Sequence, residues 1–239
     1  MIKKQVPILF IVFNRPSVTK VVWDAICASK PYKVYICQDA PRVNNKDDVI
    51  NCDEVDSIFK NKQNFEIIRK KRFSNMGCKN GVPDAISWFF DNEEMGIIIE
   101  DDCVPTLSFF SFCNQMLLKF KDDSSVMHIS GSNYLSSNQE LNSFYVSTIN
   151  DVWGWATWRR AWENFTFDMS DYLLFKKNAL DNKYFKNSQI ASWMRFYLES
   201  AFSNESNVWS SYWVYAMIKH SGYTICLLYT SDAADDLRG

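Results

Sequence analysis

Short apolar runs alternate with amphipathic stretches along the first 130 residues. Apolar positions at helical spacing predict helices over residues 18–26, 47–60, 82–90 and 107–120, with Ser17 as the expected cap of the first. Five runs have the length and composition of buried strands: 7–13 (PILFIVF), 33–37 (KVYIC), 65–69 (FEIIR), 96–99 (GIII) and 126–130 (VMHIS). This alternation predicts an α/β fold, with a mostly parallel sheet covered by helices on both faces.

The pattern changes after residue 130. An irregular polar stretch reaches residue 150, and the aromatic block DVWGWATWRRAW (151–162) follows. A helix is expected over 188–202, and another helix with a last strand over 207–228. No repeat or linker interrupts residues 1–228, so we expect one domain. Residues 229–239 have no amphipathic period and resemble translated sequencing-adaptor readthrough, which predicts a non-native tail on a domain truncated at its C-terminal end.

Polar residues follow the ends of the first four predicted strands. Parallel strands end at one edge of a sheet, and ligands bind at that edge. We therefore expect a hydrogen-bonding, mostly anionic rim there, made of Asn14 and Arg15, Gln38 and Asp39, Ser74 and Asn75, and Glu100, Asp101 and Asp102.

The three acids in GIIIEDDCVP are the strongest chemical signal. Three consecutive carboxylates behind a buried strand repel one another unless something compensates their charge. Mg²⁺ or Mn²⁺ would do so, because these ions prefer carboxylate and phosphate oxygens. Held against a diphosphate, such an ion would stabilise a leaving nucleotide. The alternative is that two of the three acids face solvent or pair with Lys or Arg; at the end of a central strand we favour the metal.

Composition excludes several classes of protein. Lys plus Arg is 26 and Asp plus Glu is 28, so the net charge of −2 disfavours duplex nucleic acid as a partner. No apolar run approaches the roughly 20 residues of a membrane-spanning helix. The 7 cysteines include no CxxC pair, which favours a reducing cytoplasm over a disulfide framework or zinc site. Aromatic residues reach 16%, which suits either a ring-filled core or rings stacked on a sugar.

Four segments, PILFIVFNRP, YICQDAPR, GIIIEDDCVP and DVWGWATWRRAW, occur in an order that resembles the GT-A nucleotide-diphospho-sugar transferases. The likeness covers about residues 6–228 and is strongest to bacterial haemolysin-like HlpA-type glycosyltransferases, with a fainter likeness to the inverting N-acetylglucosaminyltransferase I type. It implies a GT-A-like fold and transfer of a sugar from a nucleoside-diphosphate donor, a UDP-sugar, to an acceptor hydroxyl. It further implies Mn²⁺ or Mg²⁺, a glycan or lipid-linked acceptor in surface glycan synthesis, and a cytoplasmic enzyme compatible with peripheral membrane association.

The resemblance also implies roles for the rim residues. Asp102 would reach the metal, while Glu100 and Asp101 contact ribose or donor-sugar hydroxyls. The nucleotide side would be formed by Asn14, Arg15, Asp39, and Asn75 with Gly77 and Gly81. Structural alternatives remain for each of these: a turn residue at Asn14, a solvated charge at Arg15, an Asx turn at Asp39, and loop shaping at Asn75 and Gly77.

The aromatic block matches the acceptor side of these enzymes, which implies acceptor contacts at Trp153, Trp155 and Trp209. Core packing is the alternative, and helical spacing favours it for Trp155, Trp158 and Trp162. Such enzymes often place an Asp general base in the late helix, where this chain has Ser210, which cannot act as a base unaided. Asp151 is the substitute candidate, with a helix N-cap as its alternative.

The two histidines and four alternative functions remain to be interpreted. We interpret His128 as a strand residue and His220 as a charge at a helix end. Neither GxGxxG nor GxxxxGK[ST] occurs, which argues against a Rossmann dehydrogenase and a P-loop kinase. The remaining alternatives are a non-catalytic nucleotide-sugar binder or inactive fragment, favoured by Ser210, and a metal-dependent phosphatase, favoured by Asp101 and Asp102.

Overall fold

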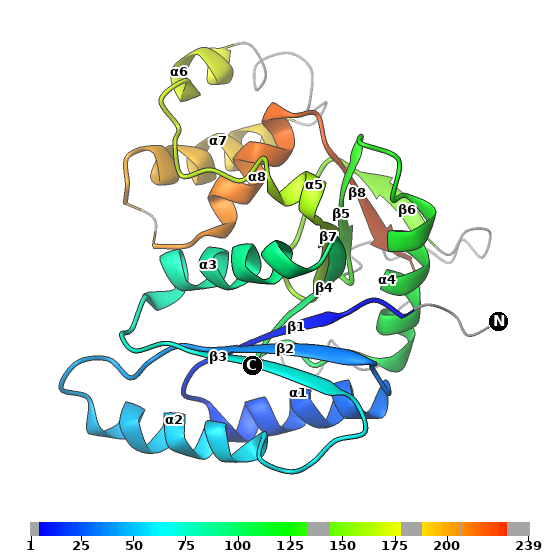
Figure 1. Cartoon of the computed structure of the whole chain (residues 1–239). Coiled ribbons are helices and arrows are strands. Elements are labelled where there is room, and N and C mark those ends of the chain that lie inside the picture. The colour runs from blue at the N-terminus through cyan, green and yellow to red at the C-terminus, as the bar shows by residue number, and fades with distance from the viewer. Residues whose placement is uncertain (1–4, 133–143, 178–187, 206, 229–239) are drawn as a thin grey trace.

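The computed structural model describes residues 5–132, 144–177, 188–205 and 207–228. Eight strands among these residues form one sheet in the order β3-β2-β1-β4-β7-β5-β8-β6 (Figure 1). All of them except β6 and β7 run in the same direction. The strands are β1 (Ile8–Val12), β2 (Lys33–Gln38), β3 (Glu66–Lys71), β4 (Met95–Glu100), β5 (Val126–Ser130), β6 (Phe144–Ser147), β7 (Trp155–Trp158) and β8 (Tyr223–Leu227).

Helices cover both faces of this sheet because successive strand side chains point to opposite sides. Phe10 and Ile99 pack against α1, α2 and α4, whereas Leu9 and Ile98 pack against α3, α5 and α8. A third apolar cluster joins α6, α7 and α8 farther out (Figure 1). The helices are α1 (Pro16–Ala28), α2 (Lys46–Ile58), α3 (Gly77–Asn92), α4 (Leu107–Lys119), α5 (Arg159–Trp162), α6 (Tyr172–Phe175), α7 (Ser188–Phe202) and α8 (Ser210–Lys219).

The predicted α/β fold with a mostly parallel sheet is confirmed, including all five expected strands. Two local predictions were wrong. Ser17 does not cap α1, which begins at Pro16 with Arg15 before it, since the fixed φ of proline suits the first helical position. Trp155 and Trp158 lie in strand β7, not in a helix, because the partners on both sides stabilise an extended WATW segment. The expected tail, 229–239, lies outside the described residues.

Strand β7 changes how the two halves of the chain meet. It pairs antiparallel with β4 on one side and with β5 on the other, so a segment from the second half separates two strands of the first. Ile98, two residues before Glu100, lies opposite Trp155, the first residue of β7, and the chain turns just before it at Gly154, which has a positive φ. The turn before β7 therefore reaches the carboxyl edge of the sheet, next to the acidic triplet.

Gly96 in β4 has no room for a side chain. A Cβ there would lie 2.8 Å from the carbonyl oxygen of Pro7 and closer still to the ring of Phe89. We expect Gly96→Ala to lower the free energy of unfolding by about 2–3 kcal/mol, as overpacking of a close-packed core does. Urea denaturation followed by tryptophan fluorescence measures this loss, and a change below about 0.5 kcal/mol would contradict this packing.

Candidate functional site at the carboxyl edge of the sheet

The carboxyl edge gathers residues from six separate segments. Strands β1, β2 and β4 end there at Val12, Gln38 and Glu100, and helices α1 and α3 begin there. The turn that leads into β7 and the first turn of α8 reach the same edge, since Trp209 at the start of α8 stacks on Trp155 at the start of β7. The sheet thus brings together most of the residues that the sequence analysis singled out.

Arg15 compensates the charge of the acidic triplet. Its guanidinium donates to Oδ2 of Asp102 at 3.0 Å and to Oδ1 of Asp101. Asp101 is buried and also accepts from the backbone N–H of Phe13 at 3.3 Å, whereas the Asp102 side chain is 51% exposed. Two of the three acids, Asp101 and Asp102, are therefore paired with an arginine, as the alternative to a metal site in the sequence analysis expected.

Glu100 differs from its two neighbours. Its carboxyl group is recessed and receives no hydrogen bond from any residue that the structure describes. Burial, and then the charges of Asp102 and Asp101, raise the pKa of Glu100 to about 7. At neutral pH this carboxyl is therefore partly protonated, and it is able to donate or accept a hydrogen bond.

Cys78 lies near enough to the acidic triplet to feel its charge, and the sequence analysis did not single it out. The residue is exposed in the first turn of α3, but its thiol is partly shielded from water; this partial burial, and then the charges of Glu100 and Asp102, raise the pKa of the thiol. The thiol therefore lies within the electrostatic field of the acidic triplet. The available signal was its place in the segment RFSNMGCKNG (72–81), which connects β3 to α3 and includes the first turn of α3.

The acidic triplet fits a divalent cation through one residue only. Within the described ranges, no group of three or more His, Cys, Asp or Glu side chains is arranged to hold a metal ion. Asp101 is committed to Arg15 and Phe13, and Glu100 is recessed, so Asp102 offers the accessible carboxylate. A single Asp together with diphosphate oxygens suits Mg²⁺ or Mn²⁺, which commonly take one or two protein carboxylates and fill their coordination with phosphate and water.

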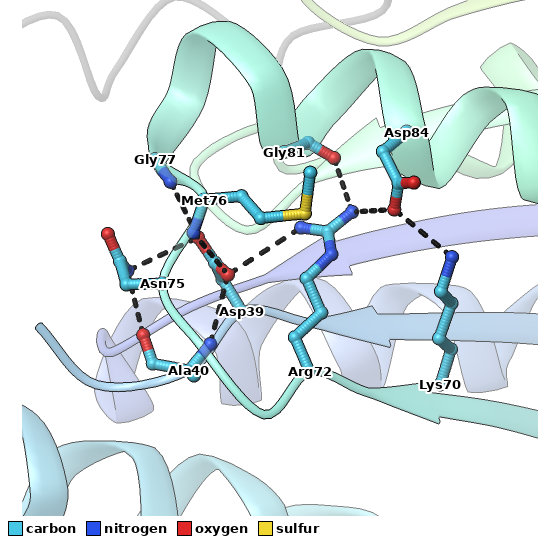
Figure 2. A network of polar contacts seen from close by, with 9 residues as sticks. All are labelled: Asp39, Ala40, Lys70, Arg72, Asn75, Met76, Gly77, Gly81 and Asp84. Carbon is cyan, nitrogen blue, oxygen red and sulfur yellow. Dashed lines mark hydrogen bonds and ion pairs between the residues drawn. The ribbon is translucent and has the colours of Figure 1, made fainter.

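Asp39 is a structural centre of the edge (Figure 2). Its carboxylate accepts from the backbone N–H groups of Met76 and Gly77 at 3.1 and 3.0 Å, which belong to the start of α3, and from the amide of Asn75 at 3.2 Å. It also accepts from the N–H of Ala40 at 3.0 Å. The sequence predicted that Asp39 binds uracil or ribose. In the structure its carboxylate already accepts hydrogen bonds from these protein donors, so Asp39 holds the β3–α3 loop in place instead.

Arg72 extends this network behind Asp39. Its buried guanidinium lies 3.7 Å from Asp39, donates to Asp84 at 2.7 Å and donates to the carbonyl of Gly81 at 2.6 Å (Figure 2). A Cβ on Gly81 would lie 2.8 Å from Arg72 Nη1, so glycine leaves the space that the guanidinium fills. Gly81 therefore serves helix packing, and Asn75, which also donates to the carbonyl of Ala40 at 2.7 Å, shapes the loop.

Asn14 faces the same rim but is bound to the protein. Its side chain donates to Asp48 at 2.7 Å, and Asp48 also accepts from the guanidinium of Arg42 at 2.6 and 2.8 Å. The hydrogen bond from Arg42 lowers the pKa of Asp48. The structural alternative for Asn14, a turn residue after β1, describes this contact better than a nucleotide contact, and Asp48 was not found from the sequence.

The three tryptophans that the sequence analysis assigned to acceptor binding differ in their exposure to solvent. Trp153 is 59% exposed at the edge. Trp155 is 0% and Trp209 2% exposed, and their rings stack on each other within a buried cluster with Trp162 and Trp213. An acceptor contact at Trp155 or Trp209 was therefore a wrong prediction, because core packing covers both rings.

His128 supports the turn that carries Asp151. Its ring is buried, stacks on Trp155 at 4.8 Å, and accepts at Nδ1 from the indole N–H of Trp213 at 3.2 Å. The proton therefore sits on Nε2, which donates to the carbonyl of Asp151 at 2.8 Å. Burial lowers the pKa of His128 to about 3, so the ring is neutral at physiological pH. His128 is confirmed as a strand residue, and His220 as the residue at the C-terminal end of α8.

Asp151 and Ser210 lie near the starts of β7 and α8. Asp151 accepts from the N–H of Trp153 at 3.1 Å in an Asx turn, so the alternative of a helix N-cap was wrong; β7, not a helix, follows. Ser210 shares a 2.7 Å hydrogen bond with the hydroxyl of Tyr197. Burial raises the pKa of Tyr197, and the charge of Asp151 adds to this rise, so these groups share one electrostatic environment.

Comparison with known proteins gives similarity of fold alone. No protein-family model matches the chain, and no curated protein matches its sequence. One similar solved structure is 4-diphosphocytidyl-2C-methyl-D-erythritol synthase from Anaerococcus prevotii, with 11% identity, a TM-score of 0.43, and coverage of 82% of this chain and 99% of that one. Another is a mannosyltransferase from Pyrobaculum calidifontis in complex with GDP-Man and Mn²⁺, with 13% identity, a TM-score of 0.45, and coverage of 90% and 70%. In the described part of this chain, no helix is both long and apolar enough to cross a membrane.

Proposed function

We propose that this protein is a glycosyltransferase that moves a sugar from a nucleoside-diphosphate donor, a UDP-sugar, to an acceptor hydroxyl in surface glycan synthesis. The observation that carries the proposal is the half-exposed carboxylate of Asp102, which lies at the carboxyl edge beside Arg15 and the recessed Glu100. An acid for a metal, a guanidinium for phosphate and a carboxyl for a sugar hydroxyl are the groups that recognise a nucleotide sugar.

Each residue has a part in donor binding. Asp102 would hold Mn²⁺ or Mg²⁺, which supplies charge stabilisation to the leaving diphosphate. Arg15 binds the diphosphate directly, and Glu100 exchanges hydrogen bonds with a donor hydroxyl from its recess. Asp101 positions Arg15, and Asp39 positions the start of α3, which carries Cys78.

The acceptor side is formed by the turn before β7. Asp151 is the carboxylate proposed to accept the proton of the acceptor hydroxyl, and the exposed ring of Trp153 offers a face on which a sugar of a glycan or lipid-linked acceptor can stack. Trp155 at the start of β7 lies opposite Ile98, two residues before Glu100, which supports a place for the preceding turn near the donor-binding groups.

A non-catalytic nucleotide-sugar binder is the second candidate, and Ser210 favours it. Ser210 occupies the position where an acid was expected, and its hydroxyl is hydrogen-bonded to Tyr197. A serine in this environment takes no proton from an acceptor, so transfer would depend on Asp151.

Asp102→Ala tests the proposal. In a thermal-shift screen of UDP-sugars, we expect the wild-type protein to be stabilised by one donor only when Mn²⁺ is present. Asp102→Ala should weaken this metal-dependent binding at least about 100-fold, close to 3 kcal/mol, because it removes the accessible metal ligand. The melting temperature of the ligand-free variant should change little, since the side chain is half-exposed.

Asp122→Ala is the matched control, because Asp122 is an exposed acid just after α4 that pairs with Lys121. Undiminished metal-dependent donor binding by Asp102→Ala would refute the site. Donor binding by the wild-type protein with neither hydrolysis nor transfer to a glycan acceptor would instead support the binder.

A further inference from the structure

Arg15 forms two ion pairs that differ in strength. The pair with Asp101 is partly enclosed, and Asp101 has a second donor in the N–H of Phe13. In the pair with Asp102, the two side chains are 47% and 51% exposed and meet at 3.0 Å. Exposed pairs of this kind contribute little free energy because water competes for both partners. Arg15 is therefore anchored by Asp101 and only lightly held by Asp102.

The surroundings of Arg15 also favour an anion. Arg15 directly precedes the 13-residue helix α1, whose N-terminus has no side-chain cap and begins with Pro16. Uncapped N–H groups at a helix start carry partial positive charge and bind phosphate groups. Glu100, whose carboxyl receives no hydrogen bond from the described residues, ends β4 on the same edge and faces the charge of Arg15.

We propose that Asp102 is an internal competitor for a diphosphate at Arg15. In the free protein, the carboxylate of Asp102 occupies Nη1 of the guanidinium; when a diphosphate binds, a phosphate oxygen takes Nη1 and Asp102 is released. Asp101 retains Nη2 and keeps the guanidinium in place. The proposal deepens the proposed function, on which it rests for the identity of the nucleotide, while its chemistry concerns the diphosphate alone.

This arrangement couples the metal to the diphosphate. A cation that draws Asp102 away from Arg15 leaves the guanidinium available, so each ligand raises the affinity for the other. The same exchange removes the repulsion between the carboxylate of Asp102 and the incoming phosphate. Asp102 consequently opposes diphosphate binding when metal is absent and supports it when metal is present.

Calorimetric titration with inorganic pyrophosphate in EDTA tests this exchange. We expect Asp102→Asn to bind pyrophosphate about twofold to fivefold more tightly than the wild-type protein, the range that loss of an exposed ion pair predicts. Asp102→Glu keeps a carboxylate for Arg15 and should stay within about twofold of wild type. Arg15→Met should weaken pyrophosphate binding at least about tenfold, both in the wild-type protein and in Asp102→Asn, because it removes the guanidinium that binds the phosphate.

Equal or weaker pyrophosphate binding by Asp102→Asn, or an equal gain in Asp102→Glu, would overturn the proposal. Undiminished binding by Arg15→Met, shown to be folded by near-ultraviolet circular dichroism, would do the same. If Arg15→Met does not fold, the comparison of Asn with Glu at position 102 decides alone. Failure of the proposed function would give a different result. If the protein transfers no sugar but Asp102→Asn still binds pyrophosphate more tightly than the wild type, the competition at Arg15 holds and only the assigned reaction is wrong.

Discussion

Replacing Asp39 by alanine should destabilise the whole β3–α3 region. The carboxylate accepts from the N–H groups of Met76 and Gly77 and from the side chain of Asn75, all in the segment that opens α3. Removing the carboxylate leaves these donors without their acceptor. It also leaves the buried guanidinium of Arg72 with a single carboxylate partner, Asp84. We expect Asp39→Ala to lower the free energy of unfolding by about 3 kcal/mol, combining the loss of a helix cap with that of charged hydrogen bonds.

Urea denaturation of Asp39→Ala beside Asp91→Ala gives the comparison. Asp91 is exposed near the C-terminal end of the same helix, where a negative charge is unfavourable, so its removal should be neutral or slightly stabilising. If Asp39→Ala unfolds within about 0.5 kcal/mol of wild type but loses donor binding, Asp39 is a nucleotide ligand as first predicted from the sequence, not the organiser of the loop.

His128→Ala should be still more costly at neutral pH. The substitution opens a cavity against Trp155, and it removes the partners of the Trp213 indole N–H and the Asp151 carbonyl. Together these losses predict a decrease of about 4 kcal/mol in the free energy of unfolding. The turn that carries Asp151 and Trp153 loses its buried anchor as well, so acceptor binding should weaken with stability.

The cost should shrink in acid. The pKa of His128 is about 3 in the folded protein and about 6.5 when unfolded, so its neutral form contributes stability above pH 6.5 that is lost as the pH falls toward 3. Between pH 7 and pH 4.5 this loss amounts to about 2.7 kcal/mol in the wild-type protein and is absent from His128→Ala. The raised pKa of Glu100 has the opposite sign, but it is common to both proteins and cancels in their difference.

Urea denaturation of both proteins at the two pH values measures that difference. We expect the gap of about 4 kcal/mol at pH 7 to fall to roughly 1–2 kcal/mol at pH 4.5. A gap that is the same at both pH values would mean that His128 is protonated in the folded protein, and would contradict its burial as a neutral ring.

The first half of the fold follows from the apolar pattern alone. Runs such as PILFIVF and GIII are long enough to be buried on both faces, and helical spacing between them leaves few alternatives. The second half was harder because four-residue strands carry no period of their own. WATW fits a strand and a helix equally well, and it becomes β7 only because β4 and β5 both offer it hydrogen-bond partners.

The sequence predicted where the site lies but not which of its side chains contact one another. Strand order put Arg15, Asp39 and Glu100 on one edge, as expected. Which groups bind each other depends on side-chain reach: Arg15 spans from β1 to Asp101 and Asp102, and Asp39 turns toward the N–H groups of α3. The burial of Trp155 and Trp209 could not be predicted either. The sequence does not distinguish a tryptophan that stacks on a sugar from one that packs in the core, because this depends on its neighbours in the fold.

The position of β7 has a consequence for biosynthesis. Until a growing chain includes residues 155–158, strand β4 has a free edge, and its apolar Ile97–Ile99 segment can pair with another chain. The two halves of the sheet therefore join late, through a short segment that must find both neighbours at once. A nascent protein of this topology depends on rapid insertion of that segment, or on a chaperone, to avoid aggregation.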